Sequence, residues 1–358
     1  MGLLESIRTD LRENREKVHI QGHLRLTKSS PAYCDVTLLR DLELESDVRS
    51  WLDERISGLE LMKRYQDDAG ISISTELPDH YAMRVLSGRG AICSGRNIFL
   101  FFPYCLGVTQ SSESDCFGME LIDVWRNVFE QVVFSCARTV LGRRTLMAMI
   151  PRLLQSIDKT IYLASIFHEA GHRVGAFRVS PVADPRLKVS PFHLDVMGEL
   201  STDSLLVKNL SEFPEIAAFV TLQRLFWFGR RGFLDNPRSA WINQDNDSWI
   251  TACLWNELKR TGILRWERRG DWEIQYEQLP AFYAGLSREI EAIGAHVLNK
   301  ATEAEQDAEV SAWMKSKVEW NEKEGFVLPR DLQSVFMKCS RLPEIPQFNP
   351  ILNHEEMT

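Results

Sequence analysis

The chain has 358 residues, of which 44% are hydrophobic and 26% charged, as in an average soluble globular protein. Its formal net charge is −8, and it contains no long run of basic residues. Because binding to phosphates or to an anionic membrane requires clustered lysine and arginine, neither a nucleic acid nor a membrane is predicted as a partner. The composition does not predict the oligomeric state.

The cysteines and the N-terminus indicate the cellular compartment. The seven cysteines have irregular spacings and form no CxxC pair. A disulfide framework is therefore not expected, and neither is a zinc site built on cysteines. The first residues lack the apolar segment and cleavage site of a signal peptide, and no apolar stretch approaches the roughly 20 residues of a membrane span. We expect a cytoplasmic protein.

Residues 1–150 predict an N-terminal α+β region. It begins with a short amphipathic helix, and strand formers predict strands at 81–87 and 97–102. A glycine-rich link joins these two segments. Its glycine spacing fits neither the dinucleotide-binding fingerprint nor a P-loop, so we interpret it as a hairpin connection.

From residue 121 onward the hydrophobic spacing becomes helical. Residues 151–235 are expected to form a helical core, and residues 236–358 a mostly helical C-terminal region. A Gly-Asp pair flanked by strand formers predicts a β-hairpin near 262–278. Pro151 is placed in the first turn of its helix, and the tail after Pro329 is expected to be rich in loops. Helices are predicted at 121–141, 151–177, 195–210, 213–228, 248–262 and 281–325. The predicted fold class is α+β, helix-dominant, with a small N-terminal β region.

The segment from Phe167 to His172 reads FHEAGH and contains the motif HExxH. Residues four apart on a helix share one face, so His168 and His172 can bind the same ion. Glu169 can then accept a proton from an attacking water. The alternative is a helix with two ordinary histidines and a salt-bridging glutamate. Because the histidines continue the apolar face of their helix, that alternative leaves buried polar groups without a partner.

A zinc site of this kind needs a third protein ligand. Glu199 and Asp203 are again four residues apart on a predicted helix. This pattern resembles the ExxxD signature of the gluzincin metallopeptidases, in which the glutamate binds zinc and the aspartate orients a metal-binding histidine. The resemblance covers residues 160–205 and implies that Glu199 is a ligand and Asp203 the partner of His168.

The chain departs from the gluzincin pattern in three respects. The segment between the HExxH motif and Glu199 is longer than in thermolysin-like or aminopeptidase-N-like enzymes. Gly198 replaces the asparagine that often precedes the ligand glutamate, and there is no GAMEN-type exopeptidase motif. The metzincin pattern HExxHxxGxxH is excluded, because Arg178 occupies the position of its third ligand. His193 and Asp195 stay open as alternative ligands.

The resemblance implies a zincin-like catalytic core, with HExxH on a central helix and the strand at 97–102 as a substrate-binding edge strand. The function it implies is a zinc-dependent hydrolase that cleaves a peptide or small-molecule amide with Glu169 as general base. A donor to the oxyanion is also needed, and the candidates are His193, Tyr276, Tyr283 and His296.

Two other functions stay open. The first is a metalloenzyme that tailors a small metabolite with zinc or with non-haem iron (Fe2+), since two histidines and one carboxylate also suit that metal. The second is a binding protein with a relic site. Glu169 favours the hydrolase, because an iron oxygenase needs no base beside the metal.

Overall fold

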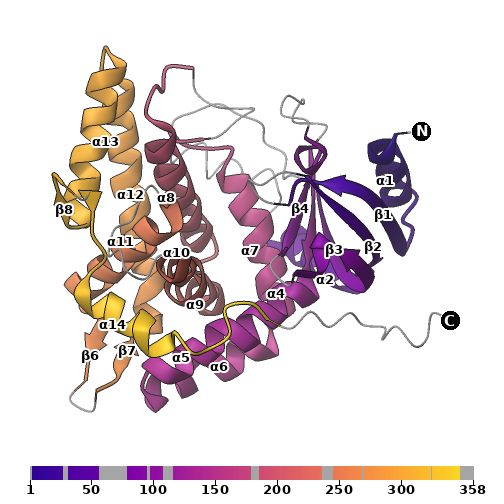
Figure 1. The fold of residues 1–358 in the computed structure, drawn as a ribbon, viewed down its shortest axis with the longest axis horizontal. Coiled ribbons are helices and arrows are strands. Elements are labelled where there is room, and N and C mark those ends of the chain that lie inside the picture. The colour runs from indigo at the N-terminus through magenta and orange to yellow at the C-terminus, as the bar shows by residue number, and fades with distance from the viewer. Residues whose placement is uncertain are drawn as a thin grey trace.

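A computed structural model describes residues 2–26, 31–55, 79–94, 97–107, 116–178, 185–235, 245–267, 270–323 and 325–346. A five-stranded sheet from the N-terminal part lies beside a larger body of helices (Figure 1). The predicted class, α+β with helix dominant, is therefore confirmed. None of the described helices is long and apolar enough to cross a membrane.

The sheet has the strand order β1-β2-β3-β5-β4. Strands β1, β2 and β3 pair antiparallel, β3 pairs parallel with β5, and β4 pairs antiparallel with β5. Strand β4 is thus an edge of the sheet. The strands are β1 (Lys17–Leu24), β2 (Ala32–Arg40), β3 (Asp79–Gly90), β4 (Phe99–Phe102) and β5 (Phe117–Leu121).

The predicted hairpin between β3 and β4 is wrong, although both strands exist. Strand β5 lies between them and hydrogen-bonds to each. All five residues of β5 are buried, so this short strand belongs in the interior of the sheet. Its sequence was not recognised as a strand because Glu120 interrupts its apolar residues and the helical pattern begins at its last residue.

A small core lies on one face of the sheet. In β1, Val18, Ile20 and Leu24 are fully buried and most of the residues between them are exposed, as the alternation of a strand requires. Helix α1 (Leu3–Arg12), the amphipathic helix expected from the sequence, contributes Ile7 and Leu11 to this core.

The helices of the larger body share a second, much larger core, which takes residues from all three regions expected from the sequence. Two short hairpins accompany them, β6 (Leu264–Trp266) with β7 (Trp272–Ile274) and β8 (Trp320–Asn321) with β9 (Gly325–Phe326). The helices are α2 (Leu42–Arg55), α4 (Ile122–Val128), α5 (Phe134–Val140), α6 (Arg143–Gln155), α7 (Ile157–Gly171), α8 (Pro191–Asn209), α9 (Pro214–Gln223), α10 (Gly229–Asp235), α11 (Asn246–Arg260), α12 (Leu279–Leu298), α13 (Glu303–Lys317) and α14 (Arg330–Cys339).

Most of the predicted helices are confirmed, and so is the hairpin near 262–278. The helices predicted at 121–141 and 213–228 each contain a π-helical turn, at Phe129–Val133 and Arg224–Phe228. The helix predicted at 281–325 is two helices, α12 and α13, followed by a hairpin. The loop-rich tail is wrong over its described part, because α14 follows Pro329 directly.

The single helix predicted at 151–177 is also wrong. Pro151 lies inside α6, and Ser156 separates this helix from α7. A proline at position 151 removes the hydrogen bond to the carbonyl of Met147, and that residue is 62% exposed, so water can replace the donor. Helix α7 ends at Gly171, and the chain turns away by Gly175, whose positive φ of 80° lies outside the helical range.

Helix α7 lies between the sheet and helix α8 (Figure 1). The two helices approach closely at Gly171, where a Cβ atom would lie 2.9 Å from the Cγ2 atom of Thr202. This contact places the C-terminal end of α7 against the middle of α8. The two sequence motifs, one on each helix, therefore face one another.

Candidate metal centre

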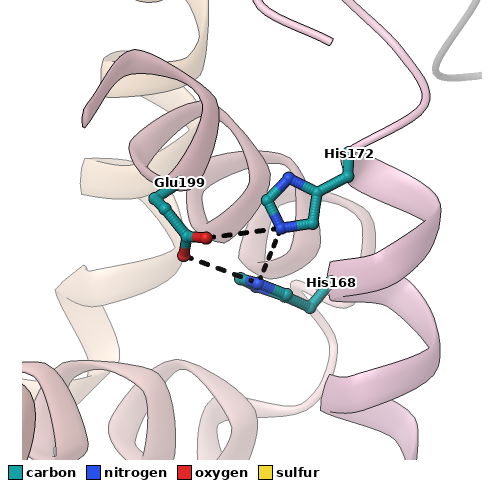
Figure 2. Close-up of side chains that lie close together, drawn as sticks. All are labelled: His168, His172 and Glu199. Atoms are coloured by element: carbon teal, nitrogen blue, oxygen red, sulfur yellow. Dashed lines mark hydrogen bonds and ion pairs between the residues drawn. The ribbon is translucent and has the colours of Figure 1, made fainter. Parts of the chain in front are cut away.

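Three donor atoms converge where α7 meets α8 (Figure 2). His168 lies in the last turn of α7, His172 directly follows that helix, and Glu199 lies on α8. The Nε2 atoms of the two histidines are 3.1 Å apart. The carboxylate oxygens of Glu199 lie 3.6 Å from Nε2 of His168 and 3.5 Å from Nε2 of His172. We call these three residues the metal centre, because one ligand atom from each lies within 4.8 Å of the others.

The hydrogen-bond partner of His168 fixes the tautomer of its ring. Nδ1 of His168 lies 3.1 Å from Oδ1 of Asp203, and a carboxylate can only accept, so Nδ1 carries a hydrogen. Nδ1 of His172 lies 3.3 Å from Oγ1 of Thr202. With both Nδ1 atoms engaged outward, both Nε2 atoms point to the metal centre, as metal-binding histidines require.

The charges around the centre favour a cation. Although burial lowers the pKa of His168, its hydrogen bond to Asp203 and the charge of Glu199 raise that pKa to about 9. The pKa of His172 is lowered by burial. Without a metal, His168 is thus protonated and its Nε2 donates to the neutral His172. A divalent cation bound to both Nε2 atoms would have to displace this proton.

Glu199 supplies the negative charge of the centre. Burial by itself raises the pKa of this carboxyl, but His172, His168 and Arg224 lower it to about 2. Two neutral imidazoles and one carboxylate form the protein ligand set of a catalytic zinc site, and the residues present therefore fit this metal.

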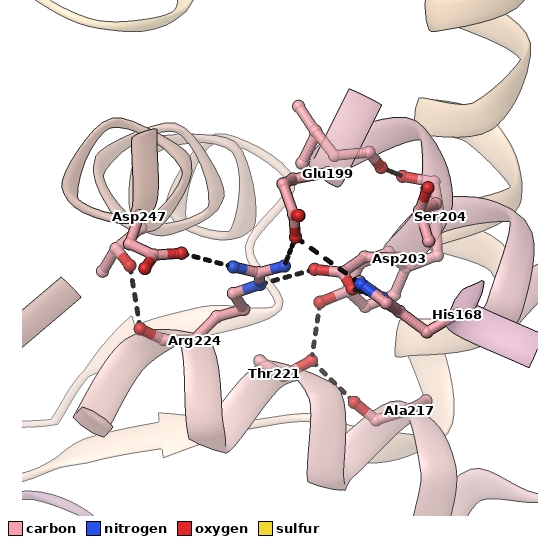
Figure 3. Close-up of polar contacts among 12 residues, drawn as sticks. His168, Glu199, Asp203, Ser204, Ala217, Thr221, Arg224 and Asp247 are labelled. Atoms are coloured by element: carbon pink, nitrogen blue, oxygen red, sulfur yellow. Dashed lines mark hydrogen bonds and ion pairs between the residues drawn. The ribbon is translucent and has the colours of Figure 1, made fainter. Parts of the chain in front are cut away.

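Arg224 connects both acidic residues of the ExxxD motif (Figure 3). Its guanidinium donates to Oε2 of Glu199 at 2.7 Å, to Oδ2 of Asp203 at 2.6 Å and to Oδ1 of Asp247 at 2.7 Å. The side chain is only 4% exposed. Sequence analysis missed this residue, although a single arginine within the apolar run that precedes residue 229 was a signal. It starts a π-helical turn, a feature that is frequent at functional sites.

The metal centre opens into a cavity of about 700 Å3. Glu169 lines this cavity together with His168 and Glu199. Ile98 and Phe99, at the edge strand β4, form part of its wall. The other apolar side chains in the wall are Trp125, Ile161, Ala164, Leu206, Phe219 and Phe228. The predicted base and the predicted edge strand therefore share one cavity with two of the predicted ligands, His168 and Glu199.

Glu120 is a second carboxyl group in this cavity that sequence analysis missed. It lies on β5 and accepts a hydrogen bond from Ser165 of α7. Burial raises its pKa to about 8, despite the hydrogen bond from Ser165. The signal in the sequence was a single acidic residue among the apolar residues of a strand.

The other candidates do not line the cavity. His193 contacts Asp307, with Nδ1 2.7 Å from Oδ1, and the hydroxyl of Tyr283 lies 3.1 Å from that of Thr221 in the core. Arg178, at the metzincin ligand position, donates to the carbonyl of Gly175. The cavity lining contains none of the remaining candidates either, which are Asp195, Tyr276 and His296.

No protein-family model and no curated protein matches the chain. Solved structures do. A structure of DPP III from Caldithrix abyssi superimposes with a TM-score of 0.60 at 12% sequence identity, over 96% of this chain and 61% of that one. Dipeptidyl-peptidase III from Corallococcus sp. strain EGB superimposes with a TM-score of 0.58 at 12% identity, over 94% of this chain and 59% of that one.

The chain thus spans about three fifths of the length of these two proteins. At this sequence identity the similarity is one of fold. What this chain shares with the two proteins is therefore the arrangement of its helices and strands.

Proposed function

We propose that the protein is a zinc-dependent hydrolase that cleaves a peptide or amide bond. The observation that carries the proposal is the convergence of His168, His172 and Glu199 beside a cavity that His168, Glu199 and Glu169 line. The similarity in fold to two proteins described as dipeptidyl-peptidase III supports a peptide as substrate. The match of the two motifs to a gluzincin site supports the same assignment.

His168, His172 and Glu199 would hold the ion. Bound there, zinc would lower the pKa of a water molecule and polarise the carbonyl group of the substrate. Glu169 lines the cavity directly after His168 in the chain, where it can accept a proton from the attacking water and pass it to the leaving nitrogen. Asp203 holds the ring of His168 in the tautomer that leaves Nε2 free to bind.

The substrate would bind along β4. This strand is an edge of the sheet, and Ile98 and Phe99 at its start line the cavity. An extended peptide can pair with such an edge through its backbone while its side chains enter the cavity. His193 and Tyr283 lie outside the cavity lining, so the proposal gives them no catalytic role.

The metabolite-tailoring alternative rests on the same ligand set, since two histidines and one carboxylate also bind non-haem iron. Glu169 in the cavity favours hydrolysis. The metal that the purified protein contains separates the two functions.

The test is elemental analysis of the purified wild type and of three variants, His168→Ala, Glu199→Ala and Glu169→Gln. We expect about one zinc ion per chain in the wild type and in Glu169→Gln, and none in the other two. His23→Ala, at an exposed histidine of β1, is the matched control and should keep the metal. Against a library of peptides and amides, Glu169→Gln should lose about 10²–10⁴-fold in rate. A wild type that binds no metal, or full activity in Glu169→Gln, would refute the proposal.

A further inference from the structure

The contacts of Arg224 involve both acidic residues of the ExxxD motif. Each carboxylate of the ExxxD motif accepts a hydrogen bond from this guanidinium and also faces a histidine of the metal centre. Asp203 accepts from Arg224 through Oδ2 and from His168 through Oδ1. Glu199 accepts from Arg224 through Oε2, which also lies 3.6 Å from Nε2 of His168, while Oε1 lies 3.5 Å from Nε2 of His172. One side chain therefore sets the rotation of both carboxyl groups.

Arg224 is itself held by α11. Its third donor nitrogen contacts Asp247 at 2.7 Å, and the hydroxyl of Thr251 donates to its backbone carbonyl at 2.8 Å. Its guanidinium also lies 4.9 Å from the ring centre of Phe228. These contacts to two helices and an aromatic ring restrict the conformation of the Arg224 side chain.

We propose that Arg224 is a positioning residue of the metal centre, which acts through Glu199 and Asp203 on the binding of the metal. The proposal rests on the proposed function, since it assumes that these residues bind an ion. A guanidinium presents its donors in a fixed planar fork, so it can hold two carboxylates at defined angles. Without the fork, Glu199 can rotate away from the histidines, and Asp203 no longer presents a fixed acceptor to His168.

A simpler role would be neutralisation of charge. Glu199, Asp203 and Asp247 are three carboxylates around one arginine, and buried negative charge requires a positive partner. A lysine at position 224 separates the two roles, because it keeps the charge but replaces the fork by a single ammonium group. If Arg224 only neutralised charge, lysine would serve as well.

The experiment compares the zinc affinity of the wild type with that of Arg224→Lys, by competition with a chromogenic chelator. We expect the variant to bind zinc about 10–100-fold more weakly, as is typical when a residue that orients metal ligands is lost. Arg230→Lys is the matched control. Arg230 is also a buried arginine, but it contacts Cys136 and the carbonyls of Cys339 and Pro343, far from the ligands in sequence and outside the cavity lining. Its zinc affinity should equal that of the wild type.

The zinc affinity of Arg224→Lys decides between positioning of the ligands and neutralisation of charge. Zinc affinity in Arg224→Lys equal to that of the wild type would overturn the proposal and leave neutralisation of charge as the role. If circular dichroism shows that Arg224→Lys does not fold, Asp247→Ala replaces it, because it frees one arm of the guanidinium at a partly exposed position. That variant should lose affinity in the same direction, and unchanged affinity would overturn the proposal. A wild type without any zinc binding would instead refute the proposed function.

Discussion

Zinc affinity should depend steeply on pH, because His168 must lose a proton to bind the ion. Its pKa in the metal-free protein is about 9, despite burial, owing to Asp203 and Glu199. The lowered pKa of His172 leaves that ring neutral, and Glu199, with a pKa of about 2, is already ionised. Zinc therefore displaces one proton. Each pH unit below the pKa of His168 should weaken binding about tenfold, so two units cost about 2.7 kcal/mol.

The assay is a competition titration with a chelator between pH 7 and 9, corrected for the protonation of the chelator. Calorimetry in buffers of different ionisation enthalpy gives the number of protons released, which should be about one. In Asp203→Asn the hydrogen bond to a charged acceptor is lost, the pKa of His168 falls, and the slope should flatten. Zinc affinity that is independent of pH in this range would refute the reasoning, because it would mean that His168 is neutral without the metal.

Three further predictions concern stability. Gly171→Ala should lower the free energy of unfolding in urea by about 1–3 kcal/mol, since its Cβ would lie 2.9 Å from Thr202, whereas Gly285→Ala, with no close neighbour, should not. Burial raises the pKa of Glu120 from 4.5 to about 8, so its contribution to stability is present below pH 4.5 and is lost as the pH rises through 8. Glu120→Gln should abolish this decline in the free energy of unfolding. A wild-type stability that is flat over that pH range would contradict the raised pKa of Glu120. Zinc at about 100 times its dissociation constant should raise the free energy of unfolding by about 2.7 kcal/mol, measured by thermal shift, and should have no effect on His172→Ala.

The convergence of the candidate ligands could be predicted from the sequence because their geometry is local. A helix places residues four apart on one face whatever surrounds it, so the spacing of His168 and His172, and that of Glu199 and Asp203, already implied two pairs of converging side chains. The alternation of β1 and the hairpin near 262–278 are local in the same sense. Local rules failed at Pro151, which lies inside α6, where the residue four positions earlier, Met147, is exposed to water.

The tertiary structure alone decided how these local pairs meet. The approach of α7 to α8 depends on Gly171 and Thr202, which are far apart in the chain. Arg224, Glu120 and Asp247 line the cavity from three other elements. His193 and Tyr283 instead form hydrogen bonds with residues outside the cavity lining. No periodicity in a sequence encodes such contacts, because they depend on how whole helices and strands pack. The residue types and spacings thus determined which chemistry was available, and the packing of α7, α8 and β5 determined which side chains share the cavity.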